Sequence, residues 1–361
     1  MSSVLNFNAG PAALPGEVLH RVQTEVVDYQ GQGMSLMEMS HRSKIFEAII
    51  ARAETNFKRL IGVGDGYRVI FVQGGASTQF ATVPMNFLPP GGVADYLVTG
   101  TWGEKAIEEA TLFGQPHLAA STKESGYRKV PVGSEIALSA NPAYVHLTSN
   151  ETIQGVQYHE FPDLGDAPLV GDMSSDILSR PIDAERFSLI YAGAQKNLGP
   201  SGVTVVLIRE SWLESANSRV PTMLRYSTHV KNNSLYNTPP MFGIYILDLV
   251  LQWLAEQGGV LGIARINEMK AASLYGAIDA SAGFYRGHAE PGSRSKMNVT
   301  FRLPSEELEK QFLIQAQDAG MIGLAGHRSV GGIRASIYNA VGLEACRTLA
   351  SFLADFAAKN G

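Results

Sequence analysis

The sequence has only one cysteine, Cys346, among 361 residues. A single thiol excludes an intramolecular disulfide framework and a metal site built from several cysteines, and it is typical of a protein that works in a reducing cytoplasm. Apolar residues recur at helical spacing from 343 to 356, which predicts a final helix with Cys346 on its buried face. The eight histidines show no metal-binding pattern, so we expect no metal ion.

Long apolar runs are also missing. The longest, from Met241 to Leu254, is shorter than the roughly 20 residues that span a bilayer, and it contains Asp248. We therefore expect a buried helix there. The first residues, 1–6, lack the basic start and apolar core of a signal peptide. Together these features predict a cytoplasmic protein without a membrane span.

A large charge of either sign is absent as well. The chain carries 29 basic and 34 acidic residues, a net charge of −5. This balance argues against a broad surface for nucleic acid. An anionic ligand would therefore have to be bound by a local group of basic residues.

Short apolar runs alternate with helical patterns through the first two thirds of the chain. This alternation favours an α/β fold with a mostly parallel sheet covered by helices. After residue 258 the pattern changes to short strands mixed with helices, including a helix expected to begin at Ser305, which predicts a smaller α+β domain. The six apolar runs are 67–72, 95–98, 143–147, 168–172, 189–191 and 203–208.

Lys196 is the first candidate for chemistry. It follows the apolar run 189–191 and small residues, just before the turn 199–202. Most lysines are solvated surface charges, but one at a strand end among Gly and Ala can lose its solvation, which lowers its pKa and leaves an amine able to form an imine. Asp172 ends the preceding run and could pair with a protonated pyridine nitrogen. The pair suggests pyridoxal phosphate.

Other candidates also follow strands, where open α/β sheets bind their ligands. The Gly-rich turn 73–78 between a strand and a helix is typical of a phosphate site. Trp102 could stack on a flat ring, although a core tryptophan is commoner. Arg334, beside glycines, could bind a carboxylate through paired hydrogen bonds, and His41 and Arg42 could bind an anion at a helix start. A solvated surface position remains the alternative for these three.

Several ordered motifs resemble the phosphoserine aminotransferase family, within the class V pyridoxal-phosphate-dependent aminotransferases. The resemblance extends from Asn6 to the last helix. The motifs that carry it are Ser40-His41-Arg42, Ser179-Arg180-Pro181-Ile182-Asp183, Ala192 to Asn197, Asn237-Thr238-Pro239-Pro240 and Gly331 to Ala340.

The resemblance implies the type I aminotransferase fold with a seven-stranded, mostly parallel sheet in the large domain. We expect an N-terminal arm (1–15) that packs with the small domain, a large cofactor-binding domain (16–257) and a small C-terminal domain (258–361). It also implies a homodimer with shared active sites and one pyridoxal phosphate per subunit. The implied reaction is reversible transfer of the amino group from L-glutamate to 3-phosphohydroxypyruvate, giving O-phospho-L-serine and 2-oxoglutarate. The related phosphorylated hydroxythreonine of vitamin B6 synthesis is a possible second substrate.

The same resemblance assigns roles to individual residues. Lys196 would bind the cofactor covalently and act as acid and base, and Asp172 would pair with the ring nitrogen. Trp102 would stack on the ring and Thr152 would bond its hydroxyl. The remaining cofactor contacts would come from Ala76, Ser77 and Gln195, with Asn237 and Thr238 of the other subunit reaching the phosphate. Arg334 would bind the substrate α-carboxylate, and the substrate's second acidic end would be bound by His41, Arg42, His327 and Arg328.

Two positions depart from the family pattern, and three other functions stay open. Ala76-Ser77 replaces the Gly-Arg of some members, which leaves phosphate binding more dependent on backbone amides, and Ala9 replaces a serine.

An aminotransferase for an unphosphorylated acid, such as an alanine–glyoxylate type, would leave the His-Arg pairs without an anion. A cysteine desulfurase would need a thiol on a mobile loop rather than on an apolar helix face. A non-catalytic cofactor-binding protein would not need Lys196.

Overall fold

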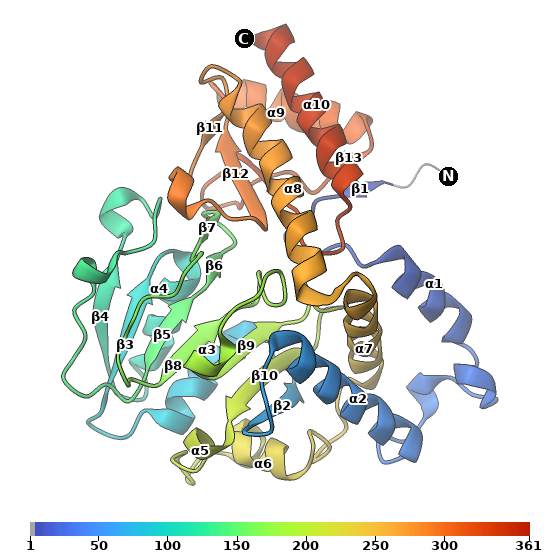
Figure 1. Cartoon of the computed structure of the whole chain (residues 1–361), viewed down its shortest axis with the longest axis vertical. Coiled ribbons are helices and arrows are strands. Elements are labelled where there is room, and N and C mark those ends of the chain that lie inside the picture. The colour runs from blue at the N-terminus through green and yellow to red at the C-terminus, as the bar shows by residue number, and fades with distance from the viewer. Residues whose placement is uncertain (1–3) are drawn as a thin grey trace.

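The computed structural model describes residues 4–361, and the fold is built around a seven-stranded sheet (Figure 1). β10 pairs antiparallel with both of its neighbours, while every other pair in the sheet is parallel. The predicted mostly parallel α/β fold is confirmed. In spatial order, the strands are β2 (Tyr67–Val72), β10 (Thr204–Arg209), β9 (Phe187–Gly193), β8 (Leu169–Asp172), β5 (Val145–Thr148), β3 (Val93–Val98) and β4 (Gln115–Ser121).

Helices cover both faces of this sheet, because successive strand residues point to opposite sides. In β2, Val69 and Phe71 join one apolar cluster, and Ile70 and Val72 join the other. The first cluster is completed by α2 (Lys44–Ile61) and α7 (Met241–Glu256). The second cluster is completed by α3 (Gly75–Phe87), α4 (Thr101–Ala110) and α6 (Tyr226–Lys231).

The edge strand β4 is missing from the six apolar runs found in the sequence. It pairs only with β3, and just Ala119 and Ala120 of its seven residues are buried. An edge strand needs no continuous apolar run, because much of it faces water. Its sequence therefore carried no signal of a buried strand.

The apolar stretch 241–254 forms the buried helix that was predicted. α7 ends before Gly258, whose φ of 84° lies in the left-handed region, and α8 (Gly259–Asp279) follows after a bend of 81°. Within residues 4–361, no single helix is long and apolar enough to cross a membrane, and α7 with α8 pass that test only as a bent pair.

A second, antiparallel sheet lies in the C-terminal part of the chain. It contains β11 (Arg286–Gly287), β12 (Asn298–Arg302) and β14 (Ile333–Ser336). α9 (Glu306–Asp318) begins where predicted, because the Ser305 hydroxyl accepts the N–H of Leu308. α10 (Leu343–Asn360) packs along α8 (Figure 1). Its Cys346 is completely buried. The predicted α+β part is confirmed.

The N-terminal segment returns to this C-terminal part. β1 (Leu5–Asn6) pairs in parallel with β13 (Met321–Ile322), and Phe7 is fully buried in the C-terminal core. α8 contributes to both cores, so the predicted domain limits of 15 and 257 stay predictions. Residues 1–3 of the expected arm lie outside the described residues. They are also the first half of the stretch 1–6, in which we expect no signal peptide. The remaining α-helices and strands are α1 (Gly16–Glu25), β6 (Asn150–Glu151), β7 (Val156–Gln157) and α5 (Glu210–Leu213).

Candidate active site

A cavity of about 250 Å³ opens where parallel strands of the large sheet end. β5 and β8 stop at Thr148 and Asp172, and the turn after β9 carries Lys196. Open α/β sheets place their ligand sites at such carboxyl ends. Of the predicted cofactor residues, seven line this one cavity: Ala76, Ser77, Trp102, Thr152, Asp172, Gln195 and Lys196.

Lys196 points its amine at the segment that follows β5. Its Nζ donates a hydrogen bond of 2.6 Å to Oγ1 of Thr152. Burial lowers the pKa of Lys196 to about 8, although Asp172 and Glu151 nearby act in the opposite direction. Near neutral pH, an appreciable fraction of the amine is therefore unprotonated and nucleophilic.

Asp172 is held in a fixed orientation at the end of β8. The side chain is 4% exposed, and its Oδ1 accepts both the backbone N–H of Ser174 at 2.9 Å and the Ser174 hydroxyl at 2.6 Å. Burial raises the pKa of Asp172, while the Ser174 bonds and the charge of Lys196 lower it. A buried carboxylate of this kind favours a cationic partner in the cavity.

The beginning of α3 forms a third side of the cavity. Gly74 has a φ of 98°, and a Cβ placed there would lie 2.0 Å from Oγ1 of Thr78. Only glycine therefore fits this turn. No side chain among residues 4–361 caps the helix, so its first N–H groups are available to an anion.

These features fit pyridoxal phosphate. Lys196 would supply an amine for its aldehyde, Asp172 a carboxylate for its ring nitrogen, and the start of α3 amides for its phosphate. Trp102 adds an aromatic face, since Nζ of Lys196 lies 5.7 Å from its ring centroid. The indole Nε1 is buried without a hydrogen-bond partner in the described part of the chain, as expected if a ligand atom completes it.

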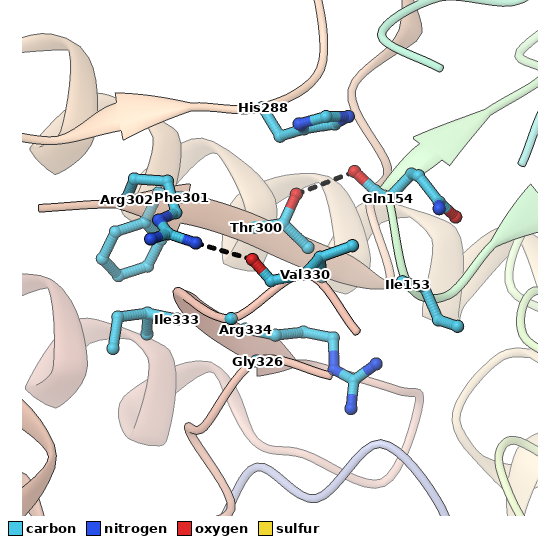
Figure 2. Close-up of a pocket in the computed structure, with 11 residues that line it drawn as sticks. Ile153, Gln154, His288, Thr300, Phe301, Arg302, Gly326, Val330, Ile333 and Arg334 are labelled. Atoms are coloured by element: carbon cyan, nitrogen blue, oxygen red, sulfur yellow. Dashed lines mark hydrogen bonds between the residues drawn. The ribbon is translucent and has the colours of Figure 1, made fainter. Parts of the chain in front are cut away.

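Arg334 approaches the site from the second sheet, where it lines a neighbouring cavity rather than the one of 250 Å³. It lies on β14, and its Nη1 donates to the carbonyl oxygen of Thr152 at 3.4 Å. Figure 2 shows its side chain extending towards the segment that contains Ile153 and Gln154. Its Nε is buried and has no partner among the residues described. The guanidinium thus keeps donor capacity for a substrate carboxylate.

The predicted anion-binding residues fall into two separate groups in one chain. Burial and the positive charges of Arg334, Arg328 and Lys105 lower the pKa of His327, which places these residues in one electrostatic neighbourhood. His41 instead lies beside Thr238, with 3.3 Å between Nδ1 and Oγ1. Neither group lines the 250 Å³ cavity, whose walls include none of His41, Arg42, Asn237, Thr238, His327, Arg328 and Arg334.

Glu151 was missed by the sequence reading. It is fully buried beside Thr152, and burial raises its pKa to about 7. The polar stretch 148–155 after a strand was visible in the sequence, but its acid looks like any solvated loop carboxylate there. Only the structure shows that Glu151 faces the first turn of α4.

The lowered pKa of Lys196 leads to a test with the cofactor-free protein. Because the neutral amine is the reactive form, the rate of combination with pyridoxal phosphate should rise about tenfold per pH unit at low pH and level off above about pH 8. Stopped-flow absorption measures this rate. A rate that keeps rising towards the ordinary lysine pKa of about 10.4 would contradict the desolvated state of Lys196.

Comparison with known proteins agrees with this geometry. Residues 4–348 match the family "Aminotransferase class-V". Phosphoserine aminotransferase from Herpetosiphon aurantiacus is 61% identical over 99% of this chain and 100% of its own length. The solved phosphoserine aminotransferase from Bacillus circulans subsp. alkalophilus is 57% identical, covers both chains fully and gives a TM-score of 0.98. The PLP-bound enzyme from Trichomonas vaginalis is 38% identical over 97% of this chain and 99% of its own, with a TM-score of 0.93. The chain belongs to the class V aminotransferase family and, within it, to the phosphoserine aminotransferases.

Proposed function

We propose that the protein is a pyridoxal-phosphate-dependent phosphoserine transaminase. It transfers the amino group of L-glutamate to 3-phosphohydroxypyruvate, giving O-phospho-L-serine and 2-oxoglutarate, and the reaction is reversible. The observation that carries this proposal is the desolvated Lys196 amine, 2.6 Å from Thr152 and in the same cavity as Asp172. The function places the enzyme in serine biosynthesis, and we assign it to the cytoplasm.

Each residue that lines the cavity would contact a different part of the cofactor. When bound, pyridoxal phosphate accepts the amino group of one substrate, takes up the electrons released at its Cα and passes the amino group to the second substrate. Lys196 would join its aldehyde, and Asp172 would keep its ring nitrogen protonated. Trp102 would cover the ring and Thr152 would bond the ring hydroxyl. The phosphate would be bound by Ala76, Ser77 and Gln195, and by Asn237 and Thr238 of a second copy of the chain.

The protein's own groups then carry the proton and orient the substrate. Nζ of Lys196 would take the proton from the Cα of glutamate and deliver it to the carbon of the cofactor that carried the aldehyde, and with the second substrate it would move a proton in the opposite direction. Thr152 Oγ1 accepts from this amine at 2.6 Å and holds it in place. Arg334 binds the α-carboxylate that both substrates share, through its planar pair of donors.

The phosphate of the acceptor is bound by the basic residues around His327 and Arg328. The charges of Arg328, Arg334 and Lys105 all act on His327 and lower its pKa. His41 and Arg42, which lie away from the cavity in one chain, would complete this site from the partner of a homodimer. The same site would accept phosphorylated hydroxythreonine.

The rival functions lack matching groups in the structure. Cys346 is buried in the C-terminal core, where burial raises the pKa of its thiol to about 11, so it supplies no thiolate for a desulfurase. An acceptor without a phosphate would leave the charge of Arg328 without an anion. A non-catalytic role leaves the placement of the Lys196 amine in one cavity with Asp172 without a purpose.

Arg328→Gln tests the phosphate assignment. Loss of one charge-assisted contact should lower kcat/KM for 3-phosphohydroxypyruvate about 10- to 100-fold and leave kcat/KM for hydroxypyruvate within about threefold. Steady-state assays of 2-oxoglutarate release measure both constants. Arg347→Gln, which removes an exposed arginine paired with Glu344 on α10, is the matched control and should change neither. Equal losses for both acceptors would refute a phosphate contact at Arg328.

A further inference from the structure

The first turn of α4 donates its backbone hydrogen bonds to the side chain of a distant acid, Glu151. Gly100, which precedes the helix, offers no side chain to cap it. Instead, Oε2 of Glu151 accepts the N–H of Trp102 at 3.0 Å, and Oε1 accepts the N–H of Gly103 at 2.9 Å. Both carboxylate oxygens thus bind groups that the start of a helix leaves unpaired, where its dipole also favours a negative charge.

Glycines at two positions make room for this carboxylate. A Cβ at Gly100 would lie 2.5 Å from Cδ of Glu151, and one at Gly103 would lie 3.4 Å from its Oε1. The Glu151 side chain is completely buried between them. The two glycines of Gly100-Thr101-Trp102-Gly103 therefore leave space for one carboxylate beside the backbone N–H of Trp102.

The residues that follow Glu151 in the chain are also fixed by hydrogen bonds. The next residue, Thr152, accepts the Lys196 amine. Two residues further on, the carbonyl oxygen of Gln154 accepts the hydroxyl of Thr300 on β12 at 2.8 Å, the bond drawn in Figure 2. The Gln154 amide in turn donates to Oγ1 of Thr101 at 2.8 Å. The segment is thus fixed to the second sheet and to α4 at once.

We infer that Glu151 is a positioning residue that holds Trp102 over the cofactor ring. The inference rests on the proposed function. Glu151 acts through the backbone of Trp102, whose indole lies 5.7 Å from Nζ of Lys196 and has an unpartnered Nε1 in the described part of the chain. The stacking energy between the indole and the cofactor ring depends on the distance and tilt between the two rings. A shift of the α4 turn would therefore weaken cofactor binding and catalysis together.

The charges around Glu151 fit this role. Lys196 and Asp172 face it, so it adds a second negative group near the amine. Burial of a carboxyl is unfavourable, and the bonds from Trp102 and Gly103 act against the resulting rise in pKa. The amides that Glu151 positions thus favour its charged form, although burial outweighs them and raises its pKa to about 7.

Glu151→Gln is the test, because it keeps the size of the side chain but turns an NH₂ group towards one of the two amides. We expect the Kd of pyridoxal phosphate to rise about tenfold, measured by quenching of indole fluorescence in cofactor-free protein, and kcat to fall about 10- to 100-fold. In a Trp102→Phe background, followed by absorption of the cofactor, the same change should alter Kd less than threefold.

Asp95→Asn is the matched control. Asp95 is also fully buried and accepts a backbone N–H, that of Ser139 at 2.8 Å, but it does not line the cavity. The Asp95→Asn substitution should reduce thermal stability and leave both the Kd of pyridoxal phosphate and kcat unchanged. A wild-type Kd in Glu151→Gln, or an equal rise of Kd with and without Trp102, would overturn the inference.

Gly100→Ala supplies an independent variant if Glu151→Gln does not fold. Its Cβ would displace the Glu151 side chain, so the same rise in Kd is expected, and an unchanged Kd would overturn the inference. The cofactor titration needs no substrate. If the unmodified protein binds pyridoxal phosphate but does not transaminate, the proposed function fails, while Kd still decides the role of Glu151.

Discussion

Replacing Lys196 by alanine should lower kcat at least about 10⁴-fold while the protein stays folded. The change removes both the amine that joins the cofactor and the acid–base group at the substrate Cα, and acid–base catalysis alone is commonly worth about 10²- to 10⁴-fold. The side chain lies in a cavity rather than in the packed core, so its loss leaves no strained void. Single-turnover absorption with glutamate measures the effect. Added methylamine should restore part of the rate, because it replaces the missing base.

Lys270 is the matched control for this experiment. It is also a buried lysine, and burial lowers its pKa to about 8 as well. Its Nζ donates to the carbonyl oxygens of Tyr338 at 2.9 Å and Val341 at 3.0 Å in the C-terminal part. Lys270→Met should therefore cost about 1–3 kcal/mol of stability and leave kcat within about threefold. Turnover of Lys196→Ala close to wild type would refute the assignment of the catalytic amine.

Asp172→Asn should lower kcat roughly 10²- to 10⁴-fold. This corresponds to the 3–5 kcal/mol typically lost when one member of a buried charge pair is removed, here the partner of the protonated ring nitrogen. The asparagine keeps an oxygen for the two bonds from Ser174, so the site should keep its shape. The loss should appear in proton removal from the substrate rather than in cofactor content.

Exchange of the α-hydrogen of glutamate for deuterium, followed by NMR, measures that step directly. The cofactor content of each preparation, read from visible absorption, serves as the control. Slowed exchange with full cofactor content is the expected result. Exchange at the wild-type rate would show that Asp172 does not control the charge of the ring.

The chemistry of the site could be predicted where local sequence determines it. Asp172 ends one short apolar run and Lys196 follows another after a few small residues, and the ends of parallel strands meet at one edge of a sheet. The Gly-rich start of α3 follows the same rule. Their convergence on one cavity therefore follows from patterns that lie within a few residues of each.

The missed features depend on contacts between distant parts of the chain. Glu151 can be recognised only from its hydrogen bonds to a helix turn about 50 residues earlier in the chain. β4 is an edge strand whose polar residues resemble those of a loop. The proposed contributions of His41 and Asn237 depend on a second chain. No periodicity in one sequence reports such contacts, although a resemblance to a family can suggest them.

The most direct test of the proposed function is the choice of acceptor by the wild-type protein. Purified enzyme loaded with pyridoxal phosphate and glutamate should release 2-oxoglutarate with a kcat/KM for 3-phosphohydroxypyruvate at least about 100-fold above that for hydroxypyruvate or glyoxylate, because only the phosphorylated acid pairs with the basic residues near Arg334. Equal or better use of glyoxylate would contradict the phosphate site and leave an aminotransferase of another specificity. No release at all from folded, cofactor-loaded protein would contradict the catalytic role itself.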